Sequence, residues 1–148
     1  MARRKDRVPV VFDTNVIVGA LLGTKRQSAN QRVYRLWLHR QLQLIVSPEI
    51  AAEYLELIER LRISPPRAAA FRERLQRHDI ITHVHLGPRF TASRDPDDNL
   101  MLATAAVGKA EYLITHDQDL LDIPAVAQRR FKFKIVTPID FLKQTESG

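Results

Sequence analysis

Short apolar runs alternate with segments of helical periodicity along nearly the whole chain. The apolar runs predict strands at residues 8–12, 42–46, 80–84, 112–115 and 133–136. The periodic segments predict helices near residues 15–22, 31–40, 48–62, 65–78 and 96–107, with a last one starting at 138. Strands that alternate with helices favour a mostly parallel sheet with helices on both faces. We therefore predict an α/β fold with three layers.

Length and composition are those of a single domain over residues 1–148. The chain has 148 residues, of which 45% are apolar and 27% charged. This length is within reach of one hydrophobic core, and the composition is too apolar for a disordered chain. We expect residues 1–7 to form a basic tail and residues 144–148 a second tail.

Cysteine content and hydropathy predict a cytoplasmic protein. The chain has no cysteines, which excludes disulfides and thiolate metal sites. No apolar run approaches the roughly 18–20 residues that span a bilayer. The basic N-terminus is similar to the start of a signal peptide, but Pro9 interrupts the apolar stretch behind it. We expect the protein to remain in the cytoplasm and to bind no membrane.

The charge of the chain fits a polyanionic partner. Lys and Arg total 23 against 17 Asp and Glu, and the formal net charge is +6. Such an excess is typical of nucleic-acid binding, although it also serves solubility. The bases gather at residues 3–7, from Arg60 to Arg77, and from Arg129 to Lys134. Several acids lie instead at predicted strand ends and helix starts. This distribution predicts a phosphate-binding rim around an acidic centre.

Carboxylates follow two of the predicted strands. Asp13 ends the first strand, and Asp117 and Asp119 come just after the strand at 112–115. Ligands of parallel α/β sheets bind beyond the carboxyl ends of the strands. The simpler interpretations are a helix N-cap for Asp13 and an Asp-rich turn for the other two. Thr14 and Asn15 could also cap the helix, however.

Further acids lie near the starts of the helices. In the helix from Pro48, Glu53 borders an apolar sector formed by Ile50, Tyr54, Leu57, Ile58 and Leu61. Glu53 can therefore reach past the core into a cleft, or it can be an ordinary solvated acid.

The segment Asp95-Pro96-Asp97-Asp98 is the densest acidic stretch. Asp95 is placed to cap the apolar helix that ends at Gly108, with Pro96 as the first helical residue. One cap does not explain three acids, and their mutual repulsion is relieved by a nearby cation.

Taken together, these side chains predict a hard metal ion. Sites made only of carboxylates favour Mg²⁺ or Mn²⁺ over zinc. Such ions activate water and stabilise the charge that develops on a phosphodiester. The histidines show no metal-ligand spacing, and His116 is interpreted as a turn residue.

Four motifs, in this order and spacing, resemble those of the PIN domain (PilT N-terminus-like) family. The motifs are Val10-Val11-Phe12-Asp13-Thr14-Asn15-Val16, Ser47-Pro48-Glu49-Ile50-Ala51-Ala52-Glu53, Asp95-Pro96-Asp97-Asp98-Asn99 and Thr115-His116-Asp117-Gln118-Asp119-Leu120. The likeness extends from about residue 8 to residues 137–142. Within the family, the chain is similar to toxin components of toxin–antitoxin modules, which are related to VapC-type ribonucleases.

The resemblance implies a PIN-like α/β/α sandwich and an endoribonuclease that depends on Mg²⁺ or Mn²⁺. It also implies an RNA substrate, homodimers and inhibition by the cognate antitoxin of a type II system. By motif position it implies that Asp13, Asp98 and Asp117 coordinate the metal ion. Glu53 coordinates the ion or positions the attacking water, and Asp119 is a further candidate ligand.

Some assignments remain open at this point. Asn15 is a polar neighbour of the site, and Asp97 competes with Asp98 because periodicity does not separate them in so apolar a helix. A protein that keeps the fold but binds nucleic acid or a partner without hydrolysis is the alternative. An aspartyl phosphatase of the haloacid-dehalogenase pattern is disfavoured, because that pattern requires Asp-x-Asp where this chain has Asp13-Thr14-Asn15.

Overall fold

The apolar runs of the sequence form the strands of one parallel sheet. The structure is a computed structural model that describes residues 6–23, 28–87 and 99–146. Its strands are β1 (Val8–Phe12), β2 (Leu42–Val46), β3 (Ile81–His83), β4 (Tyr112–Ile114) and β5 (Lys134–Val136). Within the described residues the strand order is β3-β2-β1-β4-β5, and all neighbours are parallel. The predicted sheet is confirmed.

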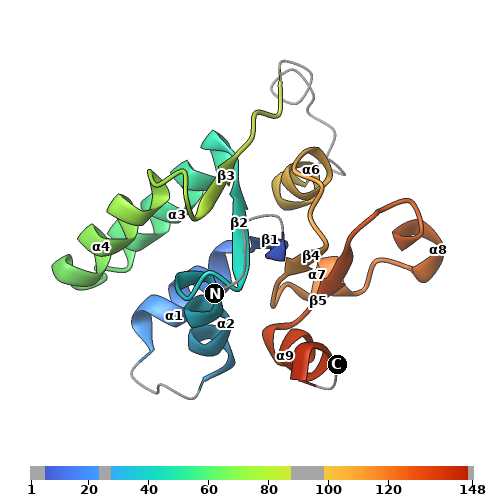
Figure 1. Cartoon of the computed structure of the whole chain (residues 1–148), viewed down its shortest axis with the longest axis horizontal. Coiled ribbons are helices and arrows are strands. Elements are labelled where there is room, and N and C mark those ends of the chain that lie inside the picture. The colour runs from blue at the N-terminus through green and yellow to red at the C-terminus, as the bar shows by residue number, and fades with distance from the viewer. Residues whose placement is uncertain (1–5, 24–27, 88–98, 147–148) are drawn as a thin grey trace.

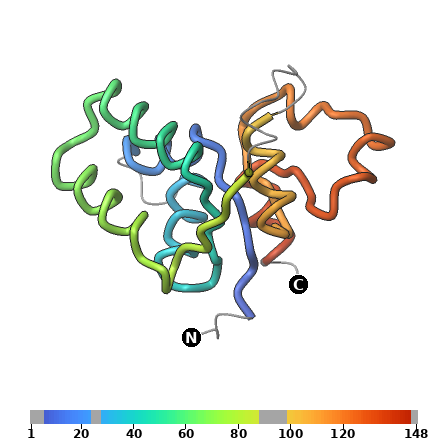
Figure 2. The backbone as a smooth tube through the Cα atoms, turned by 90° about the horizontal axis from the view of Figure 1, so that it is seen from above, coloured from blue at the N-terminus to red at the C-terminus, as the bar shows by residue number. Residues whose placement is uncertain are grey.

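Helices pack on both sides of this sheet (Figures 1 and 2). They are α1 (Thr14–Leu22), α2 (Ala29–Leu38), α3 (Pro48–Arg60), α4 (Pro65–Leu75), α6 (Leu100–Val107), α7 (Gln118–Leu121), α8 (Ala125–Gln128) and α9 (Pro138–Glu146). From β1 through β2 to β3 the chain adds strands in one direction across the sheet, and helices α1 to α4 of these connections lie on one face. The next strand, β4, pairs with the opposite edge of β1, and its connecting helix α6 lies on the other face. Crossovers of one hand require this change of side when the direction reverses.

Parallel strands give the sheet two distinct edges. All carboxyl ends of the strands lie on one edge, called here the carboxyl edge, and all amino ends lie on the opposite edge, the amino edge. Because α6 leads into the start of β4, its own start lies toward the carboxyl edge. Residues that directly follow strands therefore meet at one edge, and residues that precede strands meet at the other.

The core surrounds the central strands. Val10, Val11 and Phe12 of β1 are fully buried, as expected for a parallel strand covered on both faces. Trp37 of α2 is also fully buried, with its ring edge-on to Phe12 at a centroid distance of 6.5 Å. Its indole N–H donates to the carbonyl of Ile80 at 2.9 Å. The core thus joins α2 to both β1 and the residue that precedes β3.

Helix starts follow the capping chemistry of the sequence. Ser47 caps α3 through a hydrogen bond from the backbone N–H of Ile50 at 3.2 Å, and Pro48 is the first helical residue. Asn99 caps α6 in the same way, accepting from the N–H of Met101 at 2.8 Å. The cap of α6 is therefore Asn99 and not Asp95, and the predicted start at Asp95-Pro96 lies outside the described residues.

Several predicted boundaries differ from the structure. Helix α3 ends at Arg60, and Leu61 is its C-cap with 42% of its surface exposed, so Leu61 does not belong to the buried apolar sector. Arg62 follows with a φ of 53°, which turns the chain out of the helix. Helix α9 runs to Glu146, into the segment predicted as a tail. The short helices α7 and α8 were not predicted.

No helix in the described part of the chain is long and apolar enough to cross a membrane.

Candidate functional site

Asp13 lies at the carboxyl edge, directly after β1. Only 9% of its surface is exposed. Its Oδ1 accepts a hydrogen bond from the N–H of Thr14 at 2.7 Å, and its Oδ2 accepts one from the Thr115 hydroxyl at 2.6 Å. Asp13 is the N-cap of α1, so the simpler interpretation of this residue is confirmed. The cap and the bond to Thr115 together hold the carboxylate at the end of the strand.

Thr115 connects Asp13 to Asp117. The Thr115 hydroxyl is fully buried; it donates to Asp13 and accepts from the backbone N–H of Asp117 at 2.9 Å. The Asp117 carboxylate accepts from the N–H of Asp119 at 2.9 Å and caps α7. One buried hydroxyl therefore fixes the geometry of two candidate ligands. Thr115 has no role in the predicted site, although its position two residues before an aspartate is typical of local hydroxyl–backbone turns.

Glu53 lies on α3 and is exposed, while its neighbour Tyr54 is fully buried. The Tyr54 hydroxyl donates a hydrogen bond to the carbonyl of Phe12, the residue before Asp13. Burial raises the pKa of the Tyr54 hydroxyl well above its usual range, and the negative charges of Asp13 and Glu53 raise it further. Both carboxylates therefore act on one hydroxyl beneath the site, which stays protonated at neutral pH.

An open pocket of about 310 Å³ brings the acids together. Three candidate ligands line it: Asp13 from the end of β1, Glu53 from α3 and Asp117 from the start of α7. The other lining residues are Thr14, Asn15, Glu56, Leu57 and Arg60. The structure thus joins residues that are up to 104 positions apart, from Asp13 to Asp117, in one concave surface.

The PIN domain family matches residues 9–119 of the chain, which is most of its length. The chain belongs to the PIN domain family. The family that the four motifs predicted is therefore confirmed. A search of curated proteins gave no match.

Two solved structures are similar to this PIN domain. One is a chain of VapBC2 from Rickettsia felis, crystallised with a DNA fragment from its promoter. It is 14% identical with a TM-score of 0.54, covering 86% of this chain and 97% of that one. The other is VapC20 from Mycobacterium tuberculosis, described as a toxin that cleaves the sarcin–ricin loop. It is 15% identical with a TM-score of 0.48, covering 78% of this chain and 96% of that one. The VapBC2 chain confirms the predicted PIN-like fold.

Of the two other predicted ligands, only Asp119 belongs to the described residues, and it is not among those that line the pocket. Asp98, with Asp95 and Asp97, lies outside the described residues. Its neighbour Asn99 begins α6 near the carboxyl edge, where Ser47 and Thr104 link α6 to the start of α3 through a hydroxyl pair at 3.0 Å. Asp119 is exposed and contributes its backbone N–H to Asp117. His116 hydrogen-bonds to the side chain of Asn30 at 2.6 Å.

The oxygen groups of the pocket fit a hard cation. Its donors are carboxylate, amide and hydroxyl oxygens, and the buried Thr14 hydroxyl has no hydrogen-bond partner among the described atoms. Within the described residues, however, no three acidic or histidine side chains are close enough to hold a metal ion. Among the described residues, the carboxylates by themselves therefore do not complete a metal site.

The predicted basic rim is only partly correct. Arg60 lines the pocket and pairs with Glu56 at 2.7 Å. Arg77 pairs instead with Asp79, and both residues precede β3. Lys132 precedes β5, and Lys134 is its first residue. All these residues therefore lie at the amino edge, opposite the acidic pocket. Sequence clustering did not predict this separation, because it depends on the parallel direction of the strands.

Proposed function

We propose that this PIN domain is an endoribonuclease that depends on Mg²⁺ or Mn²⁺. The observation that carries the proposal is the meeting of Asp13, Glu53 and Asp117 in one pocket at the carboxyl edge. An oxygen-only set of this kind suits Mg²⁺ or Mn²⁺, which supplies Lewis acidity at a phosphodiester and lowers the pKa of a coordinated water. The positive charge of the chain supports a polyanionic substrate.

In this proposal each side chain has a separate role. Asp13 and Asp117 hold the ion, with Asp98 as the proposed third carboxylate and Asp119 as an outer candidate. Glu53, which is exposed on the pocket wall, coordinates the ion or accepts a proton from the attacking water. Arg60 places one cation on the same wall, where it can contact a substrate phosphate.

We further propose that the protein is the toxin of a type II toxin–antitoxin pair, a cytoplasmic homodimer that a cognate antitoxin inhibits. The sequence motifs support this assignment. The likeness in fold to the VapBC2 structure is in keeping with this proposal.

A catalytically silent PIN domain that binds nucleic acid or a protein is the second candidate. The specific observation in its favour is that, among the described residues, no three acidic or histidine side chains are close enough to hold a metal ion. The two candidates differ in one respect: in the enzyme, residues 95–98 supply a further metal ligand, and in the silent protein they do not.

Cleavage of RNA by purified protein tests the proposal. We expect cleavage with Mg²⁺ or Mn²⁺, none with excess chelator, and none by Asp13→Asn or Asp98→Asn at normal thermal stability. Asp97→Asn is the comparison for Asp98, and Asp140→Asn, an exposed acid on α9, is the matched control that should retain activity. Cleavage that persists in both Asp13→Asn and Asp98→Asn contradicts the site, and cleavage in chelator contradicts the metal requirement.

A further inference from the structure

A second pocket lies at the amino edge, between the end of α6 and the segment that leads into β5. It has a volume of about 520 Å³. Its lining combines apolar and charged side chains: Ala105, Ala106, Lys109, Ala110, Glu111, Arg130, Phe131, Lys132 and Phe133. None of these residues belongs to the acidic pocket. Strands of three to five residues span about 10–17 Å, and this length separates the two edges.

Two aromatic rings are stacked in the wall of this pocket. The rings of Phe131 and Phe133 are 4.9 Å apart at their centroids with an interplanar angle of 12°. Phe133 is buried with 5% exposed, whereas Phe131 is only half-buried. The buried ring therefore supports one face of the more exposed ring, whose surface is partly accessible to solvent. Flat aromatic surfaces of this kind accept a nucleic-acid base regardless of its identity.

Three cations line the same pocket as the stacked rings. Lys109, Arg130 and Lys132 are exposed, and in the described part of the chain their side chains form no ion pair or hydrogen bond. Among the described residues of the lining, Glu111 is the only acid, so these side chains carry a net charge of +2, three positive against one negative. By contrast, two arginines elsewhere have partners: Arg77 pairs with Asp79, and Arg67 donates to the carbonyl of Leu21.

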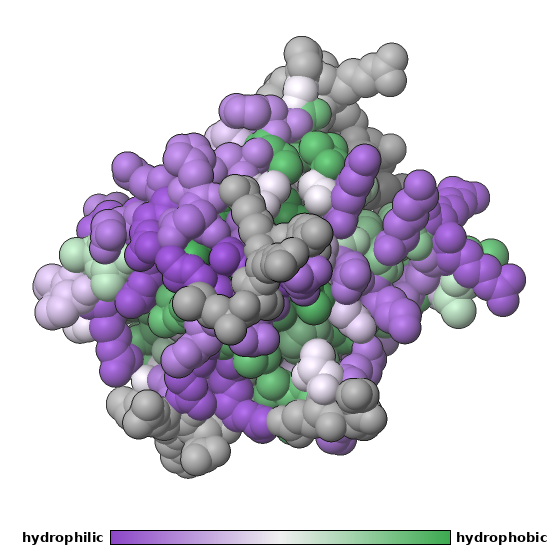
Figure 3. All heavy atoms as spheres, viewed as in Figure 1, coloured by the Kyte–Doolittle hydropathy of each residue, from purple (hydrophilic) through white to green (hydrophobic). Residues whose placement is uncertain are grey.

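The surface around this pocket is consistent with an exposed site. The connection between β4 and β5, which carries α7 and α8, projects from the sheet (Figures 1 and 2). Figure 3 shows long hydrophilic side chains over this part of the molecule, with apolar surface between them. Unpaired cations beside a flat apolar surface match the two parts of a nucleotide, namely the phosphate and the base.

We propose that this pocket binds single-stranded RNA, with one base stacked on Phe131 and the flanking phosphates on Lys109, Arg130 and Lys132. The inference rests on the proposed function, because it takes RNA as the ligand. It adds a binding site on the edge opposite the acids, so that a strand crossing the molecule contacts both. An acidic protein segment or a second copy of the chain is the competing occupant.

Fluorescence anisotropy with a labelled single-stranded RNA tests the proposal. The full chain is titrated in chelator at several salt concentrations, and a gel confirms that the probe stays intact. Phe131→Leu, which keeps an apolar side chain but removes the flat ring, should weaken binding on the order of tenfold. Lys132→Gln should reduce the slope of log affinity against log salt by about 0.7. Lys143→Gln, the same charge change on α9, is the control and should alter neither.

Cross-linking gives a second readout that does not depend on affinity. RNA carrying 5-iodouridine should cross-link on irradiation to a peptide that contains Phe131, and Phe131→Leu should lose this product. Cross-links confined to α3 and the acidic pocket would overturn the proposal.

The outcomes separate this inference from the proposed function. If the wild type cleaves RNA while Phe131→Leu and Lys132→Gln bind it normally, the second site is wrong and the nuclease stands. If the wild type cleaves nothing but both variants lose RNA binding, the nuclease is wrong and the site stands. Unchanged RNA binding with a changed molecular mass by light scattering assigns the pocket to a second copy and overturns the proposal.

Discussion

At the scale of single residues, the site depends on side chains that do not reach the solvent. Asp13 and Asp117 face the pocket, but the buried hydroxyl of Thr115 fixes their relative position through two hydrogen bonds. Tyr54 holds the carbonyl before Asp13 in the same way, from beneath. Supporting hydrogen bonds of this kind determine how well a carboxylate is oriented toward a cation.

Thr115→Val tests this arrangement, because valine keeps the shape of threonine and removes the hydroxyl. We expect Mn²⁺ affinity, measured by titration calorimetry, to fall about 10–100-fold. Stability should fall by about 1–3 kcal/mol, since Asp13 and the N–H of Asp117 both lose a partner.

Thr104→Val is the matched control, because Thr104 is also fully buried and hydrogen-bonded, but its partner is Ser47 and neither residue lines the acidic pocket. It should lower the melting temperature and leave Mn²⁺ affinity unchanged. Equal loss of affinity in both variants would show that the effect is structural and not specific to Thr115.

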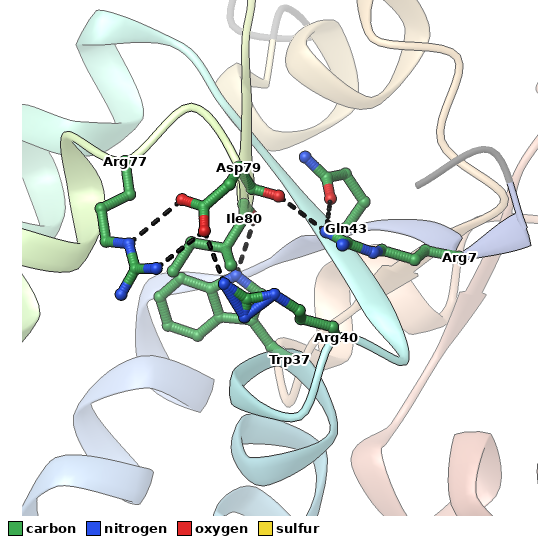
Figure 4. A network of polar contacts seen from close by, with 7 residues as sticks. All are labelled: Arg7, Trp37, Arg40, Gln43, Arg77, Asp79 and Ile80. Carbon is green, nitrogen blue, oxygen red and sulfur yellow. Dashed lines mark hydrogen bonds and ion pairs between the residues drawn. The ribbon is translucent and has the colours of Figure 1, made fainter. Parts of the chain in front are cut away.

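At the scale of elements, an ionic network links the chain segments that enter β2 and β3 (Figure 4). Asp79 precedes β3 and accepts from Arg77 at 2.7 Å and from Arg40, which precedes β2, at 2.6 Å. Arg7 donates to the carbonyl of Asp79 at 2.6 Å and to the side chain of Gln43 at 2.8 Å. One aspartate thereby joins the starts of three neighbouring strands at the amino edge.

This network predicts a specific acid dependence of stability. The pKa of Asp79 is lowered from 3.8 to about 2, chiefly by the hydrogen bonds from the Arg77 side chain. The positive charge of Arg77 and a hydrogen bond from Arg40 act in the same direction. Because this pKa is lower in the folded than in the unfolded state, the ionised carboxylate stabilises the fold when the pH is above the pKa of the unfolded chain. The contribution is therefore complete above about pH 4 and is lost as the pH falls toward 2. Urea unfolding should show Asp79→Asn less stable than wild type at neutral pH, with the difference shrinking below about pH 4.

Arg77→Gln supplies the companion measurement, because it keeps the carboxylate but removes the main donor. It should reduce the same pH dependence of stability. A difference between wild type and Asp79→Asn that stays constant from neutral pH to about pH 2 would contradict the assignment to this network.

At the scale of the whole molecule, one sheet carries both proposed binding regions. The acidic pocket lies at its carboxyl edge, and the aromatic pocket lies at its amino edge. Core side chains from both sides of the sheet form a single cluster, which includes Ile50 of α3, Phe12 of β1 and Met101 of α6. The two regions therefore share one packed scaffold.

A shared core predicts one cooperative unfolding transition. Differential scanning calorimetry should give a single peak whose calorimetric and van't Hoff enthalpies agree. For 148 residues the enthalpy should be about 100 kcal/mol near 60 °C, from about 0.7 kcal/mol per residue. Two resolved peaks would contradict the single-domain prediction.

Local sequence by itself determined the strands, the longer helices, the class of fold and the family. Apolar runs such as Val8–Phe12 and caps such as Ser47-Pro48 specify strands and helix starts through neighbouring residues alone, and the strand–helix alternation implies the parallel sheet. Sequence also marked Asp13, Glu53 and Asp117, because acids stand out at strand ends and on helix borders. Boundaries such as Leu61 were missed, since helix ends depend on contacts beyond the helix.

Only the tertiary structure decided which of these residues meet. Asp13 follows β1 and Asp117 follows β4, and the two meet because β1 pairs with β4. No local pattern encodes that pairing. The supporting roles of Thr115 and Tyr54 at Asp13 depend on hydrogen bonds between segments that are far apart in the sequence. Because the strands are parallel, Arg77 and Lys132, which precede strands, lie at the edge opposite the acidic pocket. Charge and apolarity are properties of residues, whereas proximity is set by strand order and direction.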